Sequence, residues 1–101
     1  MSSRLELQAL LEKILGSKNV YYQPPESLKM GYPAIKYSKS KIDTRKANNS
    51  TYSKLTRYDL IVISKLPDNP AIDKLLELPY CSYDRSYKVD NLNHDSLTLY
   101  Y

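Results

Sequence analysis

The sequence predicts an α+β fold, a single domain in which two helices pack on one face of a mostly antiparallel sheet. Three observations predict it. The chain has 101 residues, the size of one domain, so we expect residues 1–101 to form a single unit. Patterns typical of a helix, strands, a helix and strands follow one another along it. A long polar segment also separates two strand patterns, which predicts a projecting β-hairpin arm over about residues 39–54.

The first predicted element is a helix that ends at Gly16. Ser3 and Glu6 have the spacing of a capping box, in which a hydroxyl and a carboxylate satisfy amides of the first turn. An apolar stripe at helical spacing follows, formed by Leu7, Leu10, Leu11 and Ile14. We expect this stripe to pack on the sheet, and Gly16 to supply the left-handed residue that ends the helix.

The next three extended segments predict an edge and a hairpin. Residues 20–22 form a short segment that ends at Gln23-Pro24-Pro25, which favours an edge strand or a loop. A strand pattern covers 33–39, and its return strand covers 52–64. Residues 60–63 are apolar on both faces, as expected at the centre of a sheet. Residues 42–50 are too polar to bury, so they predict an arm with Asn48-Asn49 near its tip.

The last third of the chain predicts a second helix and two further strands. Asn69 is the expected N-cap, Pro70 the first helical residue and Pro79 the end. The expected buried stripe of this helix consists of Ile72, Leu75 and Leu76. Strand patterns follow over 80–89 and 97–101. Residues 90–95 are rich in turn formers, so we expect them to link these strands.

Enzymatic chemistry has little support in this sequence. His94 is the only histidine, and although Asn93 and Asp95 flank it, no second histidine completes a typical zinc site. Cys81 alternates with Tyr83 in a strand pattern, which favours an inert buried thiol. Two glycines cannot build a phosphate-cradling loop. We therefore expect no enzyme, cofactor or metal. The longest apolar run, residues 60–63, predicts neither a membrane span nor a signal peptide.

Positive charge is concentrated in one stretch of the chain, and tyrosine is its only aromatic residue of the Phe, Trp and Tyr group. The net charge is +4, and the stretch from Lys36 to Arg57 holds seven basic residues against Asp43 alone. Such a stretch fits a phosphate-facing surface and equally a solvated hairpin. The chain has 11 Tyr and no Phe or Trp. Because tyrosine suits surfaces that are wet before assembly and dry after it, this composition favours protein–protein interfaces.

Several segments, in their order along the chain, resemble small morphogenesis proteins of long-tailed bacteriophages. The segments are LLEKILGSKNVYYQPP (10–25), MGYPAI (30–35), RYDL (57–60), YDR (83–85), DNLNHD (90–95) and LTLYY (97–101). They are similar to the tail-terminator and head-to-tail joining proteins. That resemblance implies a structural protein of α+β fold that forms a six-fold ring, a hexamer, at the head-proximal end of the tail tube.

The resemblance also implies partners and a location. They are further copies of the chain, the tail-tube protein, the head or neck connector protein and, transiently, the DNA that passes through the ring, with no membrane. The expected location is the tail–neck junction of the virion, after synthesis in the bacterial cytoplasm. Alternatives remain open, namely a neck adaptor, a minor capsid protein, or a small basic protein that binds nucleic acid non-specifically or acts in regulation.

The arm supplies the candidate contact residues. A polar arm too long for a tight turn gains order from a partner outside the monomer. We expect protein contacts to be its main role, through Arg45, Lys46, Asn48, Asn49 and Tyr52. Weak, salt-screened contact with DNA in the channel is expected at Lys39, Lys41 and Lys54.

Overall fold

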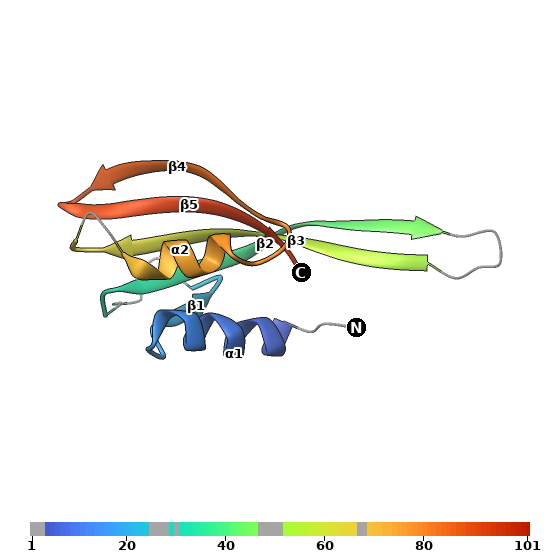
Figure 1. The fold of residues 1–101 in the computed structure, drawn as a ribbon, viewed down its shortest axis with the longest axis horizontal. Helices are drawn as coiled ribbons and strands as arrows, with labels where there is room; N and C mark the ends of the chain where they lie inside the picture. Colours follow the sequence, from blue (N-terminus) through green and yellow to red (C-terminus); the bar gives the residue numbers. More distant parts are fainter. Residues whose placement is uncertain (1–3, 25–28, 30, 47–51, 67–68) are drawn as a thin grey trace.

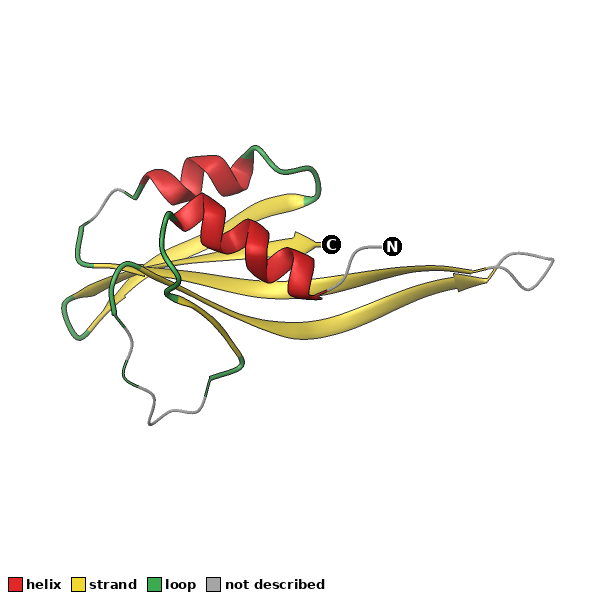
Figure 2. Ribbon diagram, turned by 90° about the horizontal axis from the view of Figure 1, so that it is seen from below, coloured by secondary structure: helices red, strands yellow, loops and turns green. Residues whose placement is uncertain are grey.

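The computed structural model describes residues 4–24, 29, 31–46, 52–66 and 69–101 and confirms the α+β prediction. In chain order the elements are α1 (Arg4–Leu15), β1 (Val20–Tyr22), β2 (Ala34–Lys46), β3 (Tyr52–Ser64), α2 (Pro70–Leu76), β4 (Cys81–Val89) and β5 (Leu92–Tyr100). The strands form one sheet in the order β1-β2-β3-β5-β4, and only the β1–β2 pair is parallel. Both helices lie on the same side of it (Figures 1 and 2).

Helix α1 follows the predicted pattern closely. Leu7 and Leu11 are fully buried, and Leu10 and Ile14, the other members of the predicted stripe, are half-buried. Gly16 has a φ of +76° and donates its backbone N–H to the carbonyl of Glu12 at 2.9 Å, which ends the helix as expected. The predicted cap, Ser3, lies outside the described residues. The helix therefore places its apolar stripe against the sheet.

The core lies between the helices and the sheet, and β3 runs through its centre as predicted. Leu60 and Val62 of β3 are fully buried on the helix side, and Ile63 is buried on the opposite face. β1 is an edge strand, as the proline-ended segment indicated, and pairs with β2 through Val20 and Ile35. The buried cluster consists of Leu7, Leu11, Val20, Ile35, Tyr37, Tyr58, Leu60, Val62, Leu75, Leu97 and Leu99.

Helix α2 begins as predicted but buries a different stripe. The side-chain Oδ1 of Asn69 accepts a hydrogen bond from the backbone N–H of Ala71 at 2.9 Å, and Pro70 opens the helix. Leu75 is buried as expected, but the prediction for Leu76 was wrong, because 41% of this residue is exposed. Ala71 is buried in its place. The short helix faces the sheet through residues spaced by four, and so Leu76 points away.

The expected link over 90–95 was also wrong. β5 begins at Leu92, so the connection from β4 is a two-residue turn at Asp90 and Asn91. These residues have φ values of +51° and +63°. A tight hairpin turn needs left-handed backbone at both central positions, and aspartate and asparagine tolerate it better than other residues with side chains. His94 and Asp95 consequently lie within a strand rather than in a turn.

The predicted arm is the outer part of the β2–β3 hairpin. The two strands pair from Ala34 opposite Ile63 to Lys46 opposite Tyr52, with a register shift between Lys39 and Lys41. β1 pairs with β2 only at residues 35–37, and β5 pairs with β3 only at residues 57–64. Beyond those pairings the hairpin continues as a two-stranded ribbon that leaves the rest of the sheet (Figure 1). The molecule consequently measures 52 × 27 × 22 Å.

Candidate assembly surfaces

The arm carries most of the predicted contact residues. Lys39 and Lys41 are exposed. Farther out, the register places Lys46 opposite Tyr52, Arg45 opposite Ser53, and Lys54 opposite Thr44. Asn48 and Asn49 lie outside the described residues. The hairpin therefore brings four of the predicted residues, Arg45, Lys46, Tyr52 and Lys54, to the outer end of the described part of the arm.

Open strand edges accompany the arm. In the described chain, no strand other than β3 pairs with β2 after Tyr37. Before Arg57, β3 has one backbone link outside the hairpin, from the N–H of Tyr101 to the carbonyl of Thr56 at 3.0 Å. The outer edge of β4 is likewise unpaired among the described residues. Unpaired N–H and C=O groups on such edges can pair with another chain. The fold thus has backbone edges available for assembly at the arm and at β4.

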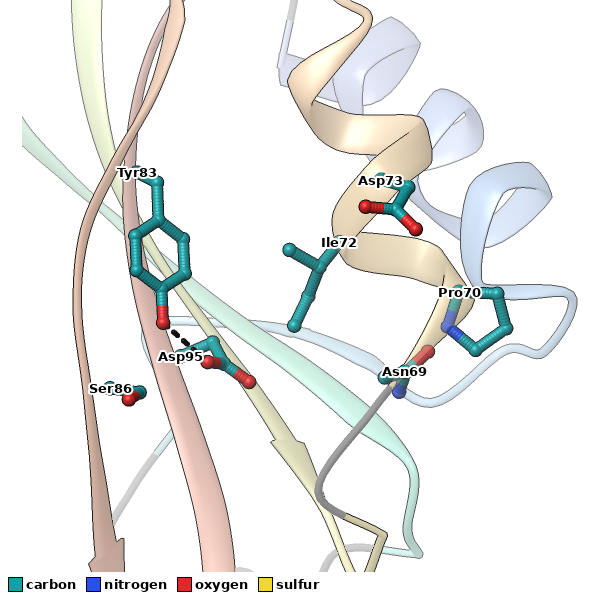
Figure 3. Close-up of a pocket in the computed structure, with 7 residues that line it drawn as sticks. All are labelled: Asn69, Pro70, Ile72, Asp73, Tyr83, Ser86 and Asp95. Carbon is teal, nitrogen blue, oxygen red and sulfur yellow. Dashed lines mark hydrogen bonds between the residues drawn. The ribbon is translucent and has the colours of Figure 1, made fainter.

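A groove lies between the beginning of α2 and the strands β4 and β5 (Figure 3). We call it the α2–β4 groove. Its volume is about 570 Å³, and its lining consists of Asn69, Pro70, Ile72, Asp73, Tyr83, Ser86 and Asp95. The phenol of Tyr83 donates a hydrogen bond to Asp95 Oδ1 at 2.7 Å. Ile72 points from α2 toward this pair in Figure 3. The groove therefore combines an apolar wall with several polar groups.

Strand register explains how these groups meet. Asp95 lies opposite Val62 and two residues before Leu97, so it occupies the helix-facing side of β5, where it is only 8% exposed. In β4 the register shifts between Tyr83 and Arg85. This extra residue lets both Tyr83 and Ser86 share the side of the sheet that Asp95 occupies. Tyr83 is 43% exposed.

The groove is electrostatically negative. Asp73 and Asp95 contribute two carboxylates, and none of the lining residues is basic. The pKa of the Tyr83 phenol reflects this setting. A hydrogen bond with Ser86 lowers that pKa, but the hydrogen bond to Asp95, loss of solvent and the Asp95 charge together raise it above the ordinary value. The phenol therefore stays neutral and continues to donate to Asp95 at ordinary pH.

The candidates for acid–base chemistry are not brought together. His94 and Asp95 are consecutive in β5, so their side chains point to opposite faces of the sheet. On the face without helices, the His94 ring stacks on Tyr87 with centroids 5.0 Å apart, and the Arg85 guanidinium lies 5.0 Å from the Tyr87 centroid. In the described chain, no group of three His, Cys, Asp or Glu side chains is placed to hold a metal ion.

Cys81 is half-buried rather than fully buried. Burial raises the pKa of its thiol, and the charge of Asp84 raises it further. The thiol is therefore protonated at neutral pH, and a protonated thiol is a weak nucleophile.

A second, apolar hollow of about 250 Å³ lies between α1, the start of β4 and the end of β5. Its lining consists of Leu10, Leu78, Pro79, Tyr80, Leu99, Tyr100 and Tyr101. Tyr80 is 72% exposed at its rim. The backbone N–H of Tyr101, which lines this hollow, bonds to Thr56 at the base of the arm. One exposed and two half-buried tyrosines therefore lie near the base of the arm.

Sequence reasoning missed the α2–β4 groove. Asp73 had no predicted role, Asp95 was assigned to a turn, and Tyr83 was noted only as part of a strand. No protein-family model matches the sequence, and no curated protein matches it. Neither helix in the part of the chain that the structure describes has the length and apolarity of a membrane span. The arm, the open edges and the groove are thus the features from which a function can be argued.

Proposed function

We propose that this chain is a structural morphogenesis protein of a long-tailed bacteriophage that caps the tail tube as a ring and joins the tail to the head or neck. The observation that carries the proposal is the arm, a ribbon that extends past the helix-covered sheet and exposes Lys39 and Lys41. The sequence resemblance to tail-terminator and head-to-tail joining proteins supports the same function.

The polarity and length of the arm favour assembly with another subunit. A polar two-stranded ribbon buries little apolar surface of its own, so contact with another subunit offsets the entropy lost on ordering it. The arm extends from β2 and β3, inside the strand order, whereas β4 is the last strand, so the arm and the edge of β4 are different surfaces. A contact between different surfaces is head-to-tail, and it closes into a ring when the rotation between subunits allows. A hexamer is the ring that the sequence resemblance implies.

Each part of the arm has a proposed role in this assembly. Arg45, Lys46, Asn48, Asn49 and Tyr52 contact a neighbouring subunit or the tail-tube protein, and the opposite side of the ring meets the connector protein. Lys39, Lys41 and Lys54 make at most transient, salt-screened contact with passing DNA. The protein performs no catalytic step and needs no cofactor in this role, and it resides at the tail–neck junction of the virion.

Shortening the arm tests the proposal. Residues 43–50 are replaced by a short glycine-containing turn, and the variant is compared with wild type and with a variant carrying an equally long Gly/Ser segment at 43–50. Circular dichroism and urea unfolding check the fold. We expect both variants to remain folded but to lose ring formation on tail tubes in negative-stain images. Normal capping and infectious particles with the shortened arm would contradict the proposed role.

Non-specific nucleic-acid binding is the second candidate, and the exposed Lys39 and Lys41 favour it. Such a protein binds DNA as a monomer with a steep salt dependence. Light scattering together with DNA titration at several salt concentrations separates the two functions. A monomer that binds DNA tightly and ignores tail tubes would favour this second function over the first.

A further inference from the structure

Resting on the proposed function, we infer that the α2–β4 groove of one subunit binds the arm of a second copy of this chain. The first argument is charge. The groove presents Asp73 and Asp95 with no basic lining residue. The part of the arm assigned to protein contact carries Arg45 and Lys46, and the arm holds a single acid, Asp43. Complementary charges of this kind fix the register of a contact and select the partner.

The geometry of Asp95 is the second argument. This carboxylate is only 8% exposed, and it accepts a hydrogen bond from the neutral phenol of Tyr83 at 2.7 Å. A basic side chain that enters the groove adds the opposite charge in a partly desolvated place, where charge-assisted hydrogen bonds are stronger than neutral ones. The groove volume of about 570 Å³ lies in the range of ligand-binding pockets in proteins, roughly 300–1,000 Å³.

The third argument is the open edge beside the groove. β4 is the last strand of the sheet, and most of its residues are exposed. An extended strand from another chain can add to such an edge through backbone hydrogen bonds while its side chains fill adjacent pockets. The arm of a second copy is an extended ribbon of this kind. Tyr83 and Ile72 would then give its apolar atoms a surface to pack on.

The arm of the same chain cannot make this contact. β3 runs from the arm at Tyr52 to Ser64, and α2 begins a few residues after its far end. The groove therefore lies near the end of the sheet opposite the arm, as Figure 1 shows for the start of α2. Each copy thus uses one arm and one groove on different partners. Such a contact is head-to-tail, which is the kind that closes into a ring.

Mixing two complementary full-length variants tests the contact without requiring a ring. Asp73→Lys reverses charge in the groove and keeps the arm, and the variant with residues 43–50 shortened keeps the groove. We expect each alone to lose self-association by at least about tenfold, the effect of one reversed charge pair. Mixed together, they are expected to form a one-to-one complex, measured by size exclusion with light scattering.

Matched variants control for charge and folding. Glu77→Lys makes the same change at the C-cap of α2, an exposed acid that does not line the groove, and it should associate like wild type. Ser86→Arg blocks the groove from β4 and gives a second test if Asp73→Lys fails to fold. Circular dichroism verifies each fold.

The outcomes separate this contact from the proposed function. A one-to-one complex from the mixture, with no wild-type ring on tail tubes, would support the contact and overturn the tail-capping function. Self-association of Asp73→Lys and Ser86→Arg at the level of Glu77→Lys would overturn the contact, even if rings form. A mixture that stays monomeric while the wild type assembles would overturn it as well.

Discussion

The phenol of Tyr37 donates a hydrogen bond to Gln8 Oε1 at 2.5 Å and thereby joins the second strand of the sheet to the first helix. The amide nitrogen of Gln8 in turn donates to the backbone carbonyl of Val20 at 2.9 Å and to Glu12 Oε2 at 3.0 Å. One side chain of α1 therefore fixes the helix to two strands. A phenylalanine would fill the core position of Tyr37 but could not make this link.

The Tyr37→Phe variant should reveal the value of that link. The ring stays packed, but Gln8 loses a hydrogen bond in a partly buried place, so we expect the free energy of unfolding to fall by about 1–2 kcal/mol. Urea unfolding measures the difference. Tyr80→Phe is the matched control, because Tyr80 is 72% exposed and should change stability by less than about 0.5 kcal/mol. Equal losses in the two variants would show that the hydrogen bond contributes nothing specific.

Stability should fall at alkaline pH because of the buried tyrosines. Burial is the main cause that raises the pKa values of Tyr37 and Tyr58 above the ordinary value of 10.0. The unfolded chain therefore loses these protons at lower pH than the folded chain does. The stabilisation is complete below pH 10.0 and is lost as the pH rises toward the higher folded values.

A double variant isolates this effect from the other tyrosines. Tyr37→Phe combined with Tyr58→Phe removes both groups, so its free energy of unfolding should fall less steeply above pH 10.0 than that of wild type. Urea unfolding at a series of pH values gives the two slopes. Identical slopes would mean that other groups govern the alkaline loss.

Local patterns made much of the fold predictable. The stripe that includes Leu7 and Leu11, the stop at Gly16 and the polar hairpin are each encoded within a few neighbouring residues, so periodicity and turn chemistry suffice to locate them. The error at Leu76 arose because packing against the sheet, and not the local sequence pattern, decided which face of α2 is buried. The error in the 90–95 link arose because a two-residue turn suffices where the sequence also allows a longer one. Turn-forming residues alone do not show that His94 and Asp95 belong to a strand.

The groove could not be predicted, because distant segments of the chain form it. Asp73, Tyr83 and Asp95 meet only after β4 and β5 pair with the register shift that follows Tyr83. A change of one residue in that register would turn Ser86 to the opposite face. The arm was easier to locate, since its polarity and length are continuous in sequence. The surface that binds the arm could not be located from the sequence, because it lies on another copy and leaves no sequence signal near the arm.

Substitution of Gly16 should lower stability by an amount that depends on how well the new residue tolerates left-handed backbone. Its φ is +76°, and a Cβ built there would meet nothing within 4 Å, so backbone strain alone sets the cost of a side chain. Gly16→Ala should lower the free energy of unfolding by about 1–2 kcal/mol. Gly16→Asn should cost less, because asparagine tolerates left-handed backbone. Thermal and urea unfolding of both variants measure this order, and a smaller loss for alanine would contradict it.

Substitution of the lysines assigned to DNA should affect DNA binding and leave the protein contact of the arm unchanged. A Lys39→Gln, Lys41→Gln, Lys54→Gln variant removes three charges from the arm while keeping its length. We expect it to bind duplex DNA more weakly and to show a slope of log affinity against log salt that is shallower by at most about three. Because Arg45 and Lys46 remain, it should still cap tail tubes. DNA titration at several salt concentrations and negative-stain imaging supply the two readouts.

A control with the same net charge decides whether position on the arm matters. Lys13, Lys18 and Lys65 are exposed and lie outside the arm, so their replacement by glutamine lowers the net charge equally. If the arm lysines contact DNA, the control should keep most of the wild-type salt dependence, because a contact with phosphate requires proximity and not only overall charge. Equal weakening in both variants would show that DNA is attracted only by the net charge. Loss of tail capping in the arm variant alone would instead place Lys39, Lys41 and Lys54 at a protein interface, and the division of the arm into two roles would be wrong.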